Sequence, residues 1–245
     1  EGIAGTCFDH VHNIPCHHAM GLYAAGIALG REDWKKRAAE FMAKVVAQQS
    51  PDGYWSEHFG PVVTYNFVYV EAMGVYYGMS KDPAVLEALR KAAIFHSNFV
   101  YPDGSLVETI DERNWYHEGV NLGNVGFAFT PEGRGYLARQ TELFLRDEKP
   151  FRGDGAGARP GWGRPSISES AFEAKRLDAD PAATFLLYGE TGPGIPVAGE
   201  RDECSFVLGK GDAAAVRAKP WFVCVSALAA APLKNRWIQD RQNHV

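Results

Sequence analysis

Two stretches of the chain, Pro51-Asp52-Gly53-Tyr54-Trp55-Ser56-Glu57 and Pro102-Asp103-Gly104-Ser105-Leu106-Val107-Glu108, share the pattern P-D-G-x-x-x-E at an offset of 51 residues. A second pair, Met20-Gly21-Leu22-Tyr23 and Met73-Gly74-Val75-Tyr76, repeats at an offset of 53. Self-similarity at a fixed period is typical of architectures in which one supersecondary unit stacks on the next. The sequence therefore predicts a structural unit of about fifty residues that recurs along the chain.

The segments between these marks have helical periodicity. Leu22, Ala25 and Leu29 fit one face of a helix that should end near Gly30, and a second helix of the same unit follows. The next unit repeats this plan, with Asp82-Pro83 as an N-cap followed by proline at the first helical position. A third unit begins after Glu108 and continues from residue 131 to about residue 146.

Residues 1–147 are thus expected to form a domain of three helical hairpins, each of about fifty residues. Hairpins of this size stack into a solenoid or close into an α/α toroid. A closed ring of six hairpins needs about twice the helical length that this domain offers. We therefore expect an incomplete toroid that belongs to a longer polypeptide.

The second half of the chain has a different character. Residues 148–165 are rich in Gly, Pro and Arg, which predicts a linker. Residues 166–245 are expected to start a second domain, with a short helix after Ser166 capped by Ser166 and Glu169. Short β-like runs follow at 185–188, 204–208, 213–217, 221–228 and 236–239. The predicted fold class is α+β, a helical-hairpin toroid portion followed by the start of an antiparallel β-sandwich.

Composition excludes several functional classes. The 25 basic and 30 acidic residues give a net charge of −5 without a basic cluster, which argues against nucleic acid as a partner. No apolar run approaches the ~20 residues of a membrane span, so no membrane partner is expected. The four cysteines form no CxxC motif and do not indicate a redox compartment. Neither the cellular location nor the oligomeric state follows from these features.

Polar pairs recur at one position of the repeat. Aligning the units places His12-Asn13, Tyr65-Asn66 and Tyr116-His117 near the start of the first helix of each unit. Equivalent positions of stacked units lie side by side on one surface. A single Tyr or His is more often a packing residue, but recurrence in three units favours a shared groove of proton-handling side chains.

The stretch Glu108-Thr109-Ile110-Asp111-Glu112-Arg113-Asn114-Trp115-Tyr116-His117 concentrates charge, amide, indole, phenol and imidazole groups. Here the sequence resembles the heparinase II/III-like polysaccharide lyases. In that family a D-G-x-x-x-E stretch leads to a Tyr-His pair on a toroid helix, and a preceding hairpin presents an Asn. The resemblance covers residues 52–66 and 103–137 and ends with Gly133-Arg134-Gly135-Tyr136-Leu137. The family joins a toroid to a β-sandwich, which agrees with the β-like runs near the C-terminus.

The resemblance implies β-elimination at a uronic acid, with the C5 proton removed and the C4 glycosidic oxygen leaving. Asn66 would stabilise the substrate carboxylate and the enolate-like intermediate, and Tyr116 would act as general base or acid. His117 would orient Tyr116 or share the proton transfer. The remaining expected substrate-binding residues are Arg113 for anionic groups, Trp55 and Trp115 for stacking on sugar rings, and Tyr65, Glu57, His12 and Asn13 along the groove.

The resemblance also implies an anionic polysaccharide as substrate, no cofactor, and a periplasmic or secreted location. His10, His12, His17 and His18 are clustered, but their spacing matches no standard zinc pattern, so no metal is expected. One alternative is a glycoside hydrolase that uses paired carboxylates, among them Asp52, Glu57, Asp103, Glu108 and Asp111. The other is a non-catalytic carbohydrate-binding module that uses its Trp and Tyr residues only to bind.

Overall fold

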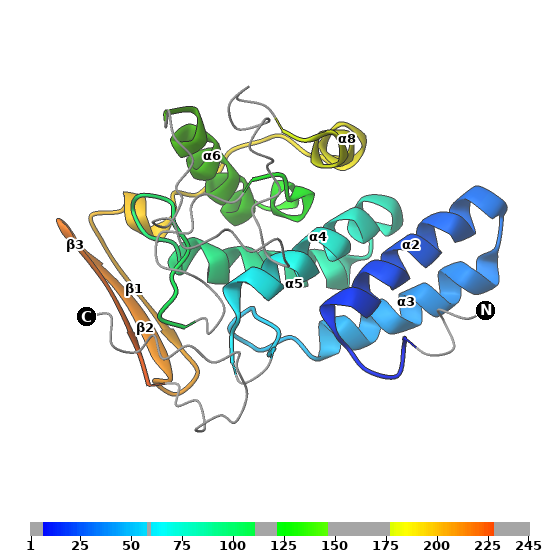
Figure 1. The fold of residues 1–245 in the computed structure, drawn as a ribbon, viewed down its shortest axis with the longest axis horizontal. Helices are drawn as coiled ribbons and strands as arrows, with labels where there is room; N and C mark the ends of the chain where they lie inside the picture. The colour runs from blue at the N-terminus through cyan, green and yellow to red at the C-terminus, as the bar shows by residue number, and fades with distance from the viewer. Residues whose placement is uncertain (1–6, 58–59, 111–121, 147–176, 228–245) are drawn as a thin grey trace, which may run out of the picture.

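The structure, a computed structural model, describes residues 7–57, 60–110, 122–146 and 177–227. In these ranges the chain is α+β: a series of α-helices packs side by side and leads to one small antiparallel sheet (Figure 1). The predicted linker at 148–165 and the predicted short helix after Ser166 lie outside the described residues. The predicted domain boundaries are not tested by this arrangement.

Two complete helical hairpins form the first half of the chain, as predicted. The first consists of α2 (Asn13–Leu29) and α3 (Glu32–Ala47), and the second of α4 (Val63–Ser80) and α5 (Pro83–Asn98). Gly30 ends α2 in the left-handed conformation at φ 64°, where a residue without Cβ carries little strain. The Asp82 side chain accepts a hydrogen bond from the Ala84 amide at 2.9 Å, so the predicted N-cap of α5 is confirmed.

The two P-D-G-x-x-x-E stretches form the same backbone turn, here named turn 1 (residues 50–57) and turn 2 (residues 101–108). In turn 1 the Gly53 amide donates to the Ser50 carbonyl at 2.9 Å. In turn 2 the Gly104 amide donates to the Tyr101 carbonyl, also at 2.9 Å and 51 residues further along. Both glycines have positive φ, 94° and 86°, which explains why each turn requires glycine. The repeat therefore exists in the backbone and not only in the sequence.

The third unit contains the predicted second helix, but the described residues before that helix differ from the first two units. Helix α6 (Pro131–Arg146) has the predicted bounds, but residues 122–130 contain only the short 3₁₀ helix η1 (Val125–Phe129). A Cβ atom on Gly126 would clash with the Val70 carbonyl, so the backbone of η1 lies directly against α4. Residues 111–121, where the predicted first helix would begin, lie outside the described residues.

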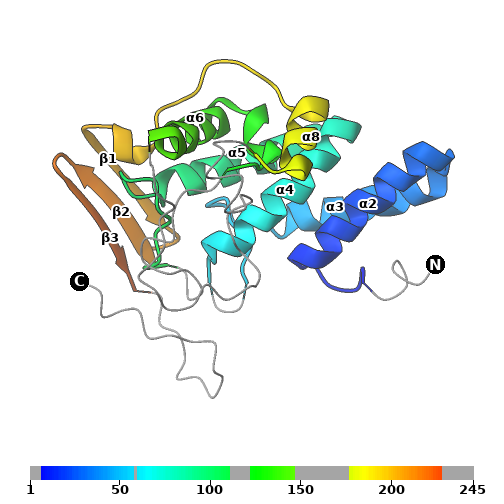
Figure 2. The same cartoon turned by 45° about the horizontal axis from the view of Figure 1, so that its top comes forward.

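The sheet is formed by three short antiparallel strands in the order β1-β2-β3 (Figure 2). Strands β1 (Glu203–Leu208), β2 (Ala213–Ala218) and β3 (Trp221–Ser226) confirm the predicted strands at 204–208, 213–217 and 221–228, the last ending earlier than expected. The predicted strand at 185–188 is wrong, because these residues end helix α8 (Ala179–Tyr188). A short apolar run does not by itself distinguish a strand from a helix. The predicted strand at 236–239 lies outside the described residues.

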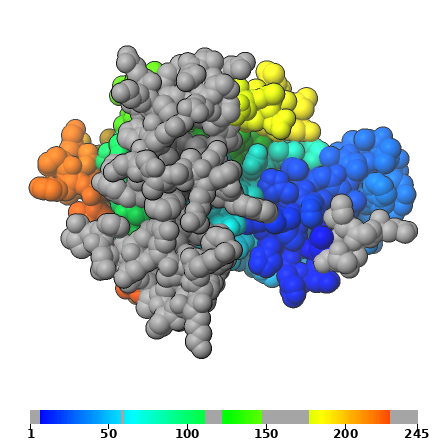
Figure 3. Space-filling view, viewed as in Figure 1, coloured from blue at the N-terminus to red at the C-terminus, as the bar shows by residue number. Residues whose placement is uncertain are grey.

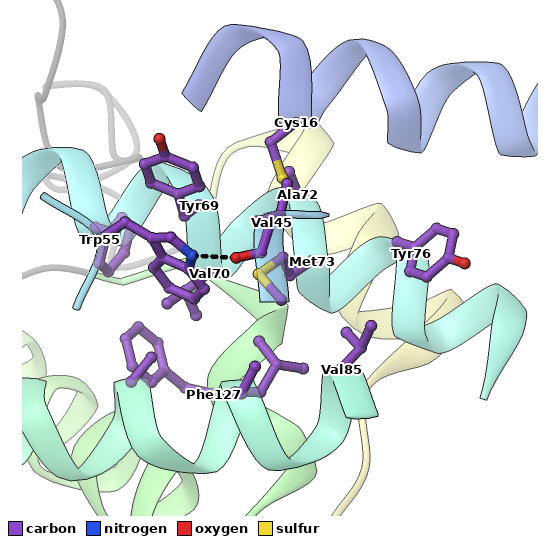
Figure 4. Close-up of a cluster of buried hydrophobic side chains, with 14 of the residues drawn as sticks. Cys16, Val45, Trp55, Tyr69, Val70, Ala72, Met73, Tyr76, Val85 and Phe127 are labelled. Atoms are coloured by element: carbon purple, nitrogen blue, oxygen red, sulfur yellow. Dashed lines mark hydrogen bonds between the residues drawn. The ribbon is translucent and has the colours of Figure 1, made fainter. Parts of the chain in front are cut away.

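Two of the three apolar clusters in the described residues hold most of the elements together. The larger one joins α2 to α6 and includes Cys16, Met73 and Phe127 (Figure 4). The smaller one packs the inner face of the sheet on turn 2 through Phe99, Leu106 and Leu208. The outer face of the sheet is exposed and apolar, with Val207, Val216, Trp221, Val223 and Val225. The first hairpin and the sheet lie at opposite ends of the molecule (Figure 3).

Candidate functional site

Three side chains from three different segments meet where turn 1 approaches the first hairpin. The Tyr69 hydroxyl donates a hydrogen bond to Glu57 Oε1 at 3.0 Å. The same carboxylate oxygen lies 3.7 Å from Nδ1 of His12, which is an ion-pair distance when the imidazole is protonated. Glu57 and His12 were both predicted as substrate-binding residues, and the structure brings them together. Tyr69 was not among the predicted site residues.

Local backbone structure positions each member of this cluster, which we name the His12 cluster (His12, Glu57 and Tyr69). His12 is the residue before α2, in extended conformation, and its side chain caps no helix amide. Glu57 is fixed by a pair of backbone hydrogen bonds with Gly60, each 3.1 Å long. Tyr69 lies one turn beyond Asn66 in α4, in the buried region beside turn 1.

Burial differs sharply within the His12 cluster. The side chain of His12 is 61% exposed, whereas that of Glu57 is 7% exposed. Burial, and then the negative charge of Glu57, raise the pKa of Tyr69 well above its usual range. Tyr69 therefore remains a neutral hydrogen-bond donor to the carboxylate across the physiological pH range. The cluster consists of a buried acceptor, a buried donor and one exposed imidazole.

Trp55 does not serve as the predicted sugar-stacking platform. The residue is 1% exposed, and its Nε1 atom donates to the Val45 carbonyl at 2.7 Å (Figure 4). The ring stacks on Tyr69 with centroids 5.0 Å apart and planes 17° from parallel. A stacking platform must offer at least one accessible ring face, and Trp55 instead packs inside the core against Tyr69. The prediction for Trp55 is therefore wrong.

Asn66 is fully buried and its amide group is used by the backbone. Oδ1 accepts from the Trp55 amide at 2.6 Å, and Nδ2 donates to the carbonyls of Trp55 at 3.0 Å and Val62 at 2.9 Å. These bonds tie turn 1 to the start of α4. Because both amide hydrogens are engaged and the side chain is inaccessible, Asn66 in this conformation cannot donate to a substrate carboxylate, contrary to its predicted role.

The other predicted site residues divide into two groups. Asn13 is buried in the first turn of α2, and Tyr65 is half-buried at the start of α4. The structure therefore places both near helix starts, as the repeat predicted. The remaining predicted residues, Tyr116, His117, Arg113 and Trp115, lie outside the described residues.

Turn 2 holds a second buried carboxylate in a different environment. Glu108 accepts a hydrogen bond from the Tyr101 hydroxyl at 3.4 Å, and its Oε2 has no partner within the described part of the chain. Burial, and then the charge of Glu108, raise the pKa of the Cys224 thiol to about 12. Cys224 belongs to β3, so the sheet covers the side of turn 2 where Glu108 lies.

The histidines near the N-terminus lie in different surroundings. His10 is exposed, and a ring nitrogen of His17 contacts the Val68 carbonyl at 3.1 Å. Burial lowers the pKa of His17, and the nearby His18 lowers it further, while the bond to Val68 opposes both. Within residues 7–57, 60–110, 122–146 and 177–227, no three His, Cys, Asp or Glu residues are grouped to hold a metal ion.

None of the helices in those ranges has both the length and the apolar character needed to cross a bilayer.

Comparison with known proteins does not place the chain in a family. No protein-family model, no curated protein and no solved structure matches it.

Proposed function

We propose that this chain belongs to a polysaccharide lyase that cleaves a uronic-acid-containing polysaccharide by β-elimination. The observation that carries the proposal is the contact between His12 and Glu57. These two residues come from successive repeat units and were predicted to share one groove. An exposed imidazole beside a carboxylate suits the binding of an acidic sugar and the transfer of its proton.

The repeat supports the assignment of the catalytic residues. Turn 1 and turn 2 share their backbone hydrogen bonds, so Glu57 and Glu108 occupy equivalent positions. Tyr116 and His117 follow Glu108 by the same spacing that separates Tyr65 and Asn66 from Glu57. In the proposed reaction Tyr116 removes or returns a proton and His117 orients it. Arg113 and Trp115 bind the anionic polysaccharide.

The proposed architecture is a portion of an α/α toroid followed by a β-sandwich. Stacked hairpins of nearly equal length support the first part, because a toroid is built from such units. The exposed apolar face of the sheet supports the second part. In a sandwich this face would pack on another sheet at a spacing of about 10 Å.

A glycoside hydrolase remains the second candidate, and the contacts of its possible carboxylates favour it less. Asp52 accepts from the Gly209 amide at 2.7 Å, and Asp103 accepts from Ser105, so both carboxylates hold backbone segments. Glu57 and Glu108 are each buried against a different tyrosine. Hydrolysis requires two carboxylates that flank one glycosidic bond. The burial of Trp55 argues against a module that only binds carbohydrate.

Absorbance of an unsaturated uronate product near 232 nm tests the proposal. The chain is incubated with a panel of uronate-containing polysaccharides, and reducing ends are measured in parallel. A lyase produces both signals, a hydrolase only reducing ends, and a binding module neither. Tyr116→Phe should lower the rate at least about a hundredfold, because it removes the proton-transfer group. Tyr77→Phe, on the half-buried side of α4, is the matched control and should retain the rate. Full activity of Tyr116→Phe would refute the role of Tyr116.

A further inference from the structure

We propose that Glu57 and Tyr69 are positioning residues that orient the ring of His12 toward an anionic sugar. The inference deepens the proposed function, and it rests on that function only for the class of ligand. It uses Tyr69, which no feature of the sequence indicated. The three side chains come from the residue before α2, from turn 1 and from the middle of α4.

The direction of the His12 ring follows from its one fixed contact. Nδ1 faces the buried carboxylate oxygen of Glu57 at 3.7 Å. Nε2 lies on the other side of the five-membered ring, and the side chain is 61% exposed. At 3.7 Å the contact is electrostatic and longer than a hydrogen bond; the negative charge favours a proton on the facing ring nitrogen and so turns the other nitrogen away. Nε2 of His12 is therefore the atom that the cluster presents to a ligand.

Glu57 can fix this ring only if its own position is fixed. Its backbone is held by the two hydrogen bonds with Gly60, and its carboxylate by the Tyr69 hydroxyl at 3.0 Å. Tyr69 in turn cannot rotate freely, because it stacks on the buried ring of Trp55. A chain of contacts thus runs from the core to the exposed imidazole, and each member limits the movement of the next.

Turn 2 shows that the arrangement is specific to turn 1. Glu108 occupies the equivalent position and also accepts a tyrosine hydrogen bond. Its described neighbours are Tyr101 and Cys224, and no histidine contacts it in the part of the chain that the structure describes. The repeat alone therefore supplies the buried carboxylate, whereas the exposed imidazole is an addition at turn 1.

Binding of methyl glucuronide, with methyl glucoside as its uncharged counterpart, tests the inference without requiring turnover. Methyl glucuronide has no glycosidic leaving group at C4, so it is not cleaved by β-elimination. Nuclear magnetic resonance titration follows the ring signals of His12, and nitrogen chemical shifts report its tautomer. We expect the glucuronide to shift the His12 signals and the glucoside to leave them in place.

Three variants separate positioning from folding. His12→Gln, at an exposed position, should weaken glucuronide binding about tenfold or more. Glu57→Gln keeps the shape and an acceptor for Tyr69, and should weaken binding about tenfold while changing the tautomer ratio of His12. Tyr69→Phe should have the same effects to a smaller extent. His10→Ala, a nearby exposed histidine, is the control and should bind as the unmodified chain does.

The outcomes distinguish this inference from the proposed function. Unchanged binding and unchanged His12 tautomer in Glu57→Gln, with folding intact by circular dichroism, would overturn the positioning role. So would equal binding of the neutral glucoside, or unchanged glucuronide binding in His12→Gln, which removes the ring without touching the core. Absence of product from every uronate polysaccharide, with glucuronide binding that depends on His12 and Glu57, would refute the lyase and leave the inference standing.

Discussion

Turn 1 and turn 2 share a backbone and differ in what packs against them. Each has a glycine at positive φ, and each closes with amide-to-carbonyl hydrogen bonds at equivalent positions. Turn 1 faces the first hairpin, and its carboxylate Glu57 meets an exposed histidine. Turn 2 faces the sheet, and its carboxylate Glu108 meets Tyr101 and the neighbourhood of Cys224.

The repeat therefore determines the backbone geometry of the two turns, and the side chains that pack against each turn determine the chemistry of its carboxylate. A buried carboxylate is costly unless it is hydrogen-bonded, and both turns satisfy one oxygen with a tyrosine hydroxyl. The tyrosines are not equivalent, because Tyr69 lies after Glu57 in α4 and Tyr101 lies before Glu108 in turn 2. Each buried carboxylate is thus hydrogen-bonded by a tyrosine from a different place in the unit, and only the carboxylate of turn 1 also lies beside an exposed imidazole.

The largest expected effect comes from replacing the glycines of the two turns. In Gly53→Ala a Cβ atom would clash with the Lys91 carbonyl of α5 at a φ of 94°, so we expect a loss of about 3 kcal/mol or more in unfolding free energy. In Gly104→Ala the φ of 86° alone costs about 1–2 kcal/mol. Urea unfolding measures both.

Gly21→Ala is the control for these two variants. Gly21 lies within α2, and a Cβ atom there meets no other atom within 4 Å. Alanine favours the helix by about 0.5–1 kcal/mol, so this variant should be slightly more stable than the unmodified chain. If Gly53→Ala were tolerated as well as Gly21→Ala, the close packing of turn 1 on α5 would be incorrect.

The second prediction concerns α5, which contacts turn 1 and leads into turn 2. His96 is buried among aromatic rings, both of its ring nitrogens lack a partner in the described residues, and burial lowers its pKa to about 3. Its unfolded pKa is about 6.5. Between these values the unfolded chain binds a proton that the folded chain does not. Stability should therefore fall as pH decreases from about 6.5, by up to about 1.4 kcal/mol per pH unit.

His96→Leu removes the titrating ring and the two unpartnered nitrogens. We expect this variant to be more stable at pH 7 by about 1–3 kcal/mol. Its advantage should grow as pH is lowered from 6.5 to 4, because only the unmodified chain takes up a proton at this position on unfolding. Thermal unfolding measured at several pH values tests this. A constant difference between the two proteins across that range would mean that His96 is protonated or solvated in the fold.

The sequence predicted the repeated features well because they depend on local chemistry. The glycine turns, the Asp82 cap and the end of α2 at Gly30 each follow from what one residue type allows the backbone to do. The three described strands were also predicted, since β1 and β3 contain aromatic and β-branched residues and turn residues separate all three, although β2 is mostly alanine. Local patterns therefore located the hairpins and the sheet.

The errors arose where tertiary contacts decide the outcome. Residues 185–188 form the end of α8 because the helix begins upstream at Ala179, which an apolar run of four residues does not reveal. Asn66 and Trp55 match a functional pattern, but each bonds the backbone of another element, turn 1 or α3, at a separation of 11 or 10 residues that local patterns do not reveal. Tyr69 was missed because a tyrosine in an apolar helix stretch is usually a core residue. Only its distance from Glu57 identifies it.

The smallest expected effect distinguishes the aspartates of the two turns. Asp52 of turn 1 accepts a hydrogen bond from the Gly209 amide, which lies in the connection between β1 and β2. Asp103 of turn 2 accepts from the Ser105 amide and hydroxyl within its own turn. Each aspartate should contribute about 1 kcal/mol, because hydrogen bonds to a charged group near the surface are partly screened.

The two losses should appear in different places. Asp52→Ala should raise the hydrogen exchange rate of the Gly209 amide and leave turn 2 unaffected. Asp103→Ala should raise the exchange rate of the Ser105 amide and leave Gly209 protected. The reason is that Asp52 links turn 1 to the connection between β1 and β2, far along the chain, whereas the Asp103 bonds are local. Protection of Gly209 in Asp52→Ala equal to that in the unmodified chain would show that the Asp52 bond does not hold the connection between β1 and β2. In that case turn 1 would not help to hold the sheet, and this difference between the two turns would disappear.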